Sequence, residues 1–241
     1  MTEIREFRIA TAGAVLHGFR FTPRNLIDAP TVLLIHGAGG RAEDLAGFAA
    51  QFAGDGVAAI TYSMAGYGRS ERKSTFDDRD RRHAEDLMEL IQSLSIKPVL
   101  LGTSRGGGIG IIAAALGAPA TGIISTGGAL DWRGVRDTTE NAEMKAWLDG
   151  WSEEELQLNS AVSYRDHISA PVRLELGEHE HPEVCRQNTT FAAHLKARGA
   201  SVEIFSAPNV GHAYLDKRFP AIWNSRIDWL TQLTPLKKRR T

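Results

Sequence analysis

The sequence predicts an α/β protein with a mostly parallel central sheet of about eight strands, an antiparallel hairpin at its N-terminal end and helices on both faces. Two observations support this prediction. Short apolar runs alternate along the chain with helical patterns of about 10 to about 17 residues, and strands joined by such crossovers pair in parallel. Residues 4–21 instead alternate around the turn Thr11-Ala12-Gly13, which favours an antiparallel hairpin.

Each further element follows from its pattern in chain order. Continuous apolar runs bounded by glycine, proline or polar residues indicate buried strands, and longer stretches with a helical period indicate helices. The helix that begins at Arg105 is rich in glycine, which lets it approach the sheet closely. Strands are therefore expected at 31–35, 57–62, 97–101, 122–125, 171–176 and 201–206, and helices at 41–52, 78–94, 105–116, 183–198 and 220–233.

Length and composition bound the organisation. With 241 residues, 42% of them hydrophobic, the chain can bury one large core, and we expect a single domain over residues 1–241. Only about 45 residues separate the strands at 122–125 and 171–176, enough for one or two helices but too few for a large lid. We expect residues 131–166 to form at most a small helical cover, and 236–241 to be a flexible basic tail.

Charge and hydropathy exclude several classes of partner. A formal net charge of −1 gives no reason to expect a nucleic-acid ligand. The charged N-terminus lacks the apolar core of a signal peptide, and no apolar run approaches the ~20 residues that span a bilayer. We therefore expect a cytoplasmic protein without a membrane partner. The sequence indicates no oligomeric state.

The most informative motif is Gly102-Thr103-Ser104-Arg105-Gly106, which lies where an apolar strand ends and a helix begins. A serine raised above a sheet on a tight turn brings the residues two before and two after it close together, and glycine fits there. Such a pentapeptide occurs by chance on the order of 0.1 times in a chain of this kind, so its context decides. The alternative is that Ser104 only caps its helix.

Three further features are of the kinds that a serine nucleophile needs, and its two side-chain partners follow it in the order acid, then histidine. Glu180 follows the strand at 171–176, and His212 follows the strand at 201–206. Neighbouring Glu178 and Glu183 are alternatives for the acid, and a surface-loop role is the alternative for His212. The turn at 36–40, rich in glycine, can direct a backbone N–H toward an oxyanion.

On these residues the chain resembles serine esterases of the α/β-hydrolase superfamily over nearly its whole length. Its most specific segments are 33–37, 102–106 and the pair Gly211-His212, and the stretch 160–177 is similar to the dienelactone-hydrolase and prolyl-oligopeptidase-like branches. The chain departs from the common pattern at Ser63 and Ala65, where an acid and an arginine often pair. It also has glutamate at position 180, where aspartate is commoner.

The resemblance implies a catalytic triad in which Ser104 is the nucleophile, His212 the general base and Glu180 the acid that orients it. It implies oxyanion donors at the backbone N–H groups of Ala38 and Arg105, with Gly39 as the alternative to Ala38. This chemistry requires no metal or organic cofactor, although His179-Glu180-His181 also admits a metal-binding interpretation.

The expected function is hydrolysis of carboxylic esters of small to medium size through an acyl-enzyme intermediate, with a small acyl compound as the partner. Thioesterase, amidase or peptidase activity would use the same triad, and a non-catalytic ligand-binding protein is the alternative of another class. Trp132, Trp147 and Trp151 either line an acyl pocket or pack on the core. The Arg105 side chain either meets a substrate carboxylate or points into the surrounding structure.

Overall fold

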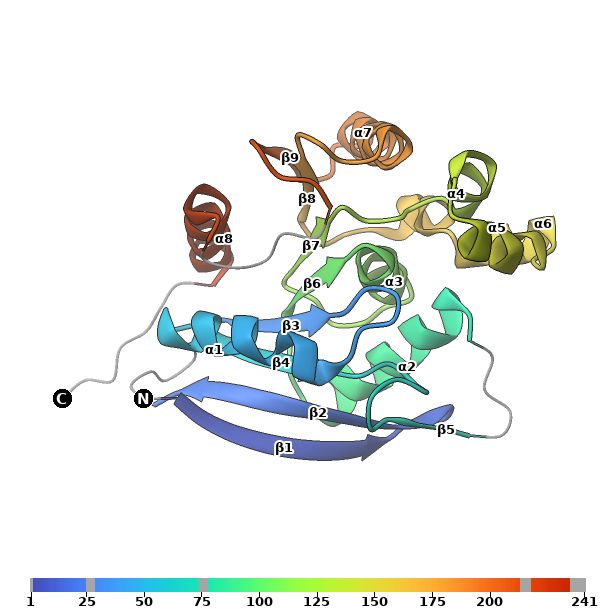
Figure 1. Ribbon diagram of the computed structural model, residues 1–241. Coiled ribbons are helices and arrows are strands. Elements are labelled where there is room, and N and C mark those ends of the chain that lie inside the picture. The colour runs from blue at the N-terminus through green and yellow to red at the C-terminus, as the bar shows by residue number, and fades with distance from the viewer. Residues whose placement is uncertain (1, 25–28, 74–77, 213–217, 235–241) are drawn as a thin grey trace.

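The computed structural model describes residues 2–24, 29–73, 78–212 and 218–234; the expected basic tail at 236–241 lies outside them. The strands form one mixed sheet in the order β1-β2-β4-β3-β6-β7-β8-β9, with β5 paired to β2 (Figure 1). β1 and β2 pair antiparallel as the predicted hairpin, and β2 also pairs antiparallel with β4. Every later pair on this path is parallel, as predicted for the core. The predicted fold class is confirmed. The strands are β1 (Thr2–Ala10), β2 (Ala14–Pro23), β3 (Thr31–Ile35), β4 (Ala58–Tyr62), β5 (Glu71–Arg72), β6 (Val99–Thr103), β7 (Gly122–Thr126), β8 (Val172–Gly177) and β9 (Val202–Ala207).

Helices cover both faces of this sheet. On one face lie α2, α3 and α7, and on the other lie α1, which follows a short 3-10 turn, and α8. The bounds are η1 (Ala42–Leu45), α1 (Ala46–Gly54), α2 (Asp80–Ser93), α3 (Arg105–Ala115), α7 (Pro182–Ala197) and α8 (Pro220–Leu233). In the described parts of the chain, no helix has both the length and the apolar character needed to span a bilayer.

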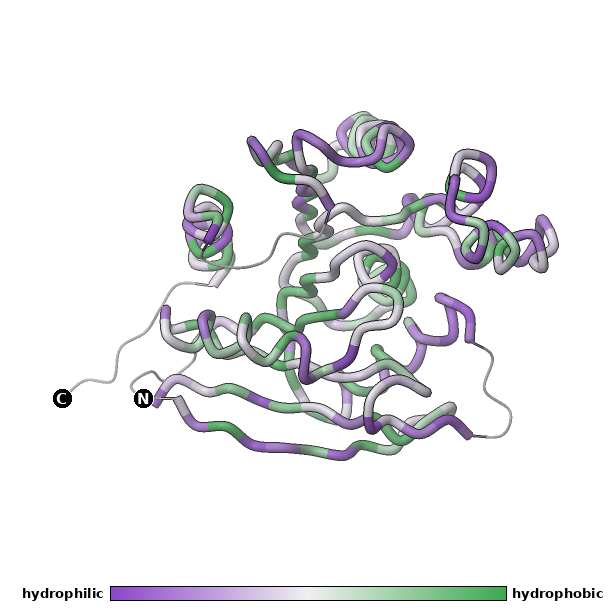
Figure 2. The backbone as a smooth tube through the Cα atoms, viewed as in Figure 1, coloured by the Kyte–Doolittle hydropathy of each residue, from purple (hydrophilic) through white to green (hydrophobic). Residues whose placement is uncertain are grey.

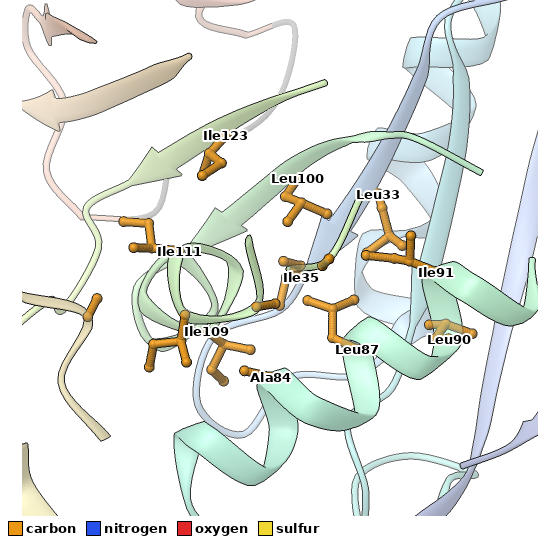
Figure 3. Close-up of a cluster of buried hydrophobic side chains, with 14 of the residues drawn as sticks. Leu33, Ile35, Ala84, Leu87, Leu90, Ile91, Leu100, Ile109, Ile111 and Ile123 are labelled. Carbon is orange, nitrogen blue, oxygen red and sulfur yellow. The ribbon is translucent and has the colours of Figure 1, made fainter. Parts of the chain in front are cut away.

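The central strands are buried on both faces and are therefore mostly apolar: every residue of β4, β6, β7 and β8 is buried, and so is all of β3 except Thr31. Successive side chains point to opposite faces, so Leu33 and Ile35 of β3 pack toward α2 and α3 (Figure 3). Val32 and Leu34 of the same strand pack toward α1 and α8. The backbone coloured by hydropathy shows this concentration of apolar residues in the middle of the sheet (Figure 2).

The segment after β7 contains more helices than the sequence prediction allowed. Three short α-helices and a 3-10 segment stand where one or two helices were expected, and they group together at one side of the sheet (Figure 1). Local caps divide the segment: the side chain of Asn141 accepts from the Met144 N–H, and Ser152 forms a capping box with Glu155. These elements are α4 (Trp132–Thr138), α5 (Ala142–Asp149), α6 (Glu153–Asn159) and η2 (Ala161–His167).

A buried ionic cluster joins the carboxyl-terminal part of the sheet to α8. The Glu175 carboxylate accepts from Arg226 Nε at 2.9 Å, from Arg173 Nε at 2.9 Å and from Thr126 Oγ1 at 2.8 Å. Burial alone would raise the pKa of Glu175, but the two guanidinium groups hold it below its ordinary value. The cluster therefore fixes the ends of β7 and β8 from which two loops of the candidate site begin.

Candidate active site

Ser104 occupies a strained turn between β6 and α3. Its φ of 54° and ψ of −123° place a non-glycine residue where few are found. A Cβ atom on Gly102 would stand 2.1 Å from the carbonyl oxygen of Gly106, and one on Gly106 would stand 2.5 Å from that of Ile35. The residues two before and two after the serine therefore meet backbone to backbone, as the sequence interpretation requires.

The side chain of Ser104 is not engaged in capping its helix. Ser104 holds the N-cap position of α3 but makes no side-chain capping hydrogen bond, and its own N–H donates to the Thr126 carbonyl at 2.9 Å. The residue is half-buried and lines a cavity of about 540 Å³. Ser104 is therefore part of the cavity wall, and its hydroxyl is not used to cap α3.

Glu180 and His212 come together from the loops after β8 and β9. His212 Nδ1 lies 2.9 Å from both carboxylate oxygens of Glu180, whose side chain is only 1% exposed. The Glu180 hydrogen bond raises the pKa of His212 above its ordinary value, although partial burial works in the opposite direction. With Nδ1–H donated to the carboxylate, Nε2 is the nitrogen available for proton exchange.

The neighbouring carboxylates have other partners. Glu178 accepts the backbone N–H of Asn209 at 2.8 Å, and Glu183 pairs with Arg186 at 2.6 Å. Of the three acidic residues that the sequence offered in this turn, Glu180 is thus the one placed against the histidine ring.

The metal-binding interpretation of 179–181 gains no support from the geometry. Glu180 is engaged with His212, and His181 Nδ1 accepts the Glu183 N–H at 3.2 Å, capping α7. Within the ranges that the structure describes, no group of three or more histidine, cysteine, aspartate or glutamate side chains is arranged to hold a metal ion.

Gly127, which sequence reasoning did not single out, supports the Glu180–His212 pair. It follows β7 with φ +55°, and a Cβ there would lie 2.5 Å from Glu180 Oε2 and 2.9 Å from His212 Nδ1. Any side chain would displace the pair. The only sequence signal is the Gly127-Gly128 doublet at the end of a strand, because the contact itself joins loops that follow three different strands.

The turn after β3 is held in shape by His36. Its Nδ1 lies 2.7 Å from the Gly37 carbonyl oxygen, and its Nε2 accepts the Met64 N–H at 2.9 Å. Burial lowers the pKa of His36 to about 4, so the ring is neutral near pH 7. A Cβ on Gly37 would lie 3.4 Å from the Ser104 Cβ, which shows that this turn packs against the serine. Ala38 follows it and lines the same cavity as Ser104.

The backbone and the side chain of Arg105 have different environments. Its N–H belongs to the first residue of α3, where amide groups have no intrahelical acceptor and the helix dipole is positive. The side chain is 3% exposed and turns inward: Nε donates to Asp80 at 2.6 Å and Nη1 to the Tyr67 hydroxyl at 3.0 Å. Trp132 Nε1 donates to the other Asp80 oxygen at 2.8 Å. The guanidinium is therefore tied into the surrounding structure, the second alternative that the sequence left open.

One cavity brings together all five residues expected at the site: Ser104, Glu180, His212, Ala38 and Arg105. Trp132 lines this cavity and an adjoining hollow, Trp147 lines the hollow, and Trp151 is buried in the small cluster of the helical segment. Trp132 and Trp147 thus agree with the pocket interpretation, and Trp151 agrees with the core interpretation. The rest of the wall combines apolar side chains, among them Ala129, Val135, Met144 and Val184, with polar ones: Thr138, Thr139, Glu140, Asn141, His179, His181 and Glu183.

We expect Gly102→Ala to damage the site although it adds only a methyl group. The new Cβ would overlap the backbone of Gly106, so the free energy of unfolding should fall by about 2 kcal/mol or more and esterase activity should fall with it. Gly47→Ala is the matched control, because Gly47 is an exposed residue of α1 with no atom within 4 Å of the added Cβ. It should stabilise the protein slightly. Thermal melting and turnover of both variants check this, and a Gly102→Ala protein equal to the parent would contradict the elbow geometry.

Comparisons with known proteins agree with the fold. The family model described as alpha/beta hydrolase fold matches residues 30–211, more than half of the chain. No curated protein sequence shows a significant match.

Solved structures give likenesses of fold at low sequence identity. A puromycin-hydrolysing peptidase from Mycobacterium tuberculosis matches with a TM-score of 0.81 and 20% identity over 100% of this chain and 40% of that one. Est1E from Butyrivibrio proteoclasticus, solved with ferulic acid, has a TM-score of 0.75 and 17% identity over 94% and 98%. A CIB-like hydrolase from Thermoplasma acidophilum has a TM-score of 0.69 and 18% identity over 96% and 100%.

Proposed function

The chain belongs to the alpha/beta hydrolase fold family, and from that premise we propose that it is a serine hydrolase that cleaves carboxylic esters of small to medium size. The observation that carries the proposal is the Glu180–His212 pair, which borders the same cavity as a serine held on a strained turn. A serine hydroxyl is a weak nucleophile until a base takes its proton, and a base needs a third group to orient it.

The proposed reaction has two acyl-transfer steps. His212 Nε2 takes the Ser104 proton as Oγ attacks the ester carbonyl carbon, and it then donates that proton to the alcohol oxygen as the carbon–oxygen bond breaks. Glu180 stabilises the imidazolium that forms between these two events. A water molecule, deprotonated by the same nitrogen, then hydrolyses the acyl-serine and restores the enzyme.

The negative oxygen of each tetrahedral intermediate needs donors that are already in place. The backbone N–H groups of Ala38 and Arg105 are our candidates. The first extends from a turn that His36 holds rigid, and the second gains from the positive end of the α3 dipole. Both donors are backbone groups, so a side-chain substitution at Ala38 or Arg105 would not remove them. Ser104 is therefore the better position at which to test the proposal by mutation.

The size and lining of the cavity support esters of modest size. A volume of about 540 Å³ lies within the range of roughly 300 to 1,000 Å³ typical of small-molecule sites. Its apolar side chains, such as Val135, Met144 and Val184, suit the hydrocarbon part of such an ester. Thioesters and amides could react by the same steps, and they are separated from esters by assay.

The test is covalent labelling combined with a substrate panel. We expect a fluorophosphonate to add once to the protein, on the peptide that contains Ser104, as read by mass spectrometry. p-Nitrophenyl esters should turn over faster than matched acyl-thioesters and peptide anilides. If Ser104 is labelled but thioesters or anilides turn over faster than esters, the substrate class changes to thioesters or amides. If the folded protein shows neither labelling nor turnover, a ligand-binding function replaces the enzymatic one.

A further inference from the structure

A second hollow of about 280 Å³ adjoins the catalytic cavity on the side away from His212. The two share five wall residues, and the first two of them carry the proposed oxyanion donors: Ala38, Arg105, Trp132, Asn141 and Met144. Ser104, Glu180 and His212 border the main cavity and are not part of the hollow's wall. The hollow is therefore a separate compartment of the same site.

The walls of this hollow carry three large aromatic side chains. Trp132 and Trp147 pack edge to face with their ring centroids 5.6 Å apart, and Tyr67 comes from the loop after β4. Hydrogen bonds fix two of the three: Trp132 Nε1 donates to Asp80, and the Tyr67 hydroxyl accepts from Arg105. Rings held in place in this way bind another ring with little loss of side-chain entropy.

Two of the three charged side chains in the wall of the hollow, Arg105 and Asp78, pair with each other, and the third is the exposed Glu143. Arg105 Nη2 lies 3.3 Å from Asp78 Oδ1, and the guanidinium stands 5.3 Å from the centre of the Trp147 ring. Burial alone would raise the pKa of Asp78, but hydrogen bonding to His83 and the charge of Arg105 hold it well below its ordinary value, so the carboxylate stays ionised. A cationic ligand would meet the Arg105 guanidinium, and an anionic one would meet the carboxylates of Asp78 and Glu143. An uncharged aromatic group meets neither difficulty.

The position of the general base indicates which half of the substrate, the alcohol or the acyl group, faces the hollow. The leaving alcohol has to lie beside His212, which protonates it, and His212 borders only the main cavity of the two. The acyl group then extends the other way, past Ala38 and Arg105. Resting on the proposed esterase function, we propose that the hollow binds an uncharged aromatic ring at the end of the acyl group, which makes arylalkanoyl esters the preferred substrates.

The available volume fits this assignment. An engineered apolar cavity of about 150 Å³ is enough to bind benzene in another protein, so a hollow of about 280 Å³ accommodates a substituted phenyl ring. Glu143 and Asn141 also line the hollow, and both are exposed.

The experiment varies the acyl group and keeps p-nitrophenol as the leaving group. kcat/KM is measured for phenylacetyl, 3-phenylpropanoyl and 4-phenylbutanoyl esters and for the corresponding cyclohexyl esters, which match them in size but lack an aromatic face. We expect the best phenyl ester to exceed its cyclohexyl partner by about tenfold. Esters carrying a 4-carboxylate or a 4-trimethylammonium group on the ring should react more slowly than the uncharged phenyl ester.

Trp147→Leu should abolish most of the phenyl-to-cyclohexyl preference, and Trp147→Phe should retain part of it. Trp151→Leu is the matched control, because Trp151 packs against Trp147 at 4.7 Å but borders neither compartment. Its ratio should equal the parent's. Because the ratio is taken within one variant, partial loss of folded protein cancels.

Labelling of Ser104 separates this inference from the proposed function. If Ser104 is labelled but phenyl and cyclohexyl esters react equally, or the trimethylammonium ester reacts fastest, the aromatic acyl assignment is wrong and the esterase proposal stands. A Trp151→Leu ratio that falls as far as that of Trp147→Leu would also overturn the assignment. If Ser104 is not labelled, the proposed function itself fails.

Discussion

Ser104→Ala should lower kcat for ester hydrolysis by several orders of magnitude and abolish fluorophosphonate labelling, while the protein remains folded. Without the nucleophile, the oxyanion donors and substrate binding sustain only residual catalysis, roughly 10³ to 10⁴ times the rate in water. The fold should survive because the Ser104 side chain makes no capping hydrogen bond. Steady-state kinetics, intact-mass labelling and the melting temperature measure the three parts of this expectation.

Ser95→Ala provides a control with the same side-chain change at another serine of positive φ. Ser95 has φ 51°, close to the 54° of Ser104, but is an exposed residue after α2. The same loss of a hydroxyl at a left-handed position should leave kcat within a few-fold of the parent. If Ser104→Ala turned over esters as fast as Ser95→Ala, the serine hydrolase proposal would have to be abandoned.

The sequence could predict the sheet because burial on both faces leaves a strong signal. Uninterrupted apolar runs at 32–35 and 99–101 and the pair Ile123-Ile124 mark three of its strands, and the helices between them provide the crossovers that parallel pairing needs. By contrast β5 has only two residues, Glu71 and Arg72, both exposed, so neither apolar content nor alternation marks it. Pairing with the edge of β2 creates this strand, and that partner is remote in sequence.

The helical segment after β7 shows a different reason for error. Its length set the expectation of one or two helices, whereas its local caps divide it into three. Ser152 and Glu155 form the S-x-x-E pattern of a capping box, and Asn141 caps the helix before it, so the signal is present in the sequence. These two caps indicate where α5 and α6 begin, which the length of the segment alone does not.

At the site, the sequence could name single residues but not their shared surroundings. Gly102 and Gly106 identify Ser104 from the sequence because the tight turn that requires them spans only five residues. Gly127, Asp80 and the aromatic hollow depend on contacts between loops that lie far apart in the sequence. Asp80, for example, binds both Arg105 and Trp132, residues 25 and 52 positions away. No periodicity or spacing records such a contact.

Glu180→Gln should lower kcat by up to about 10⁴-fold, the loss seen when the acid of a serine-protease triad becomes an amide that favours the wrong histidine tautomer. His212→Ala should lower it at least as far. The controls are Glu178→Gln and Glu183→Gln, whose carboxylates bind Asn209 and Arg186 rather than the histidine. Both should stay within a few-fold of the parent. An equally impaired Glu178 variant would move the acid assignment, and a fully active His212→Ala enzyme would exclude the triad.

The pH profile distinguishes an orienting role for Glu180 from mere structural support. Only the neutral imidazole can take the Ser104 proton, so kcat/KM should rise with pH as His212 loses its proton. The Glu180 hydrogen bond raises the pKa of His212, which places this rise above the ordinary value of about 6.5. Removing the carboxylate charge in Glu180→Gln removes the cause of the shift. Its residual activity should therefore rise at lower pH than the parent's, whereas a variant that had only lost stability would keep the parental midpoint.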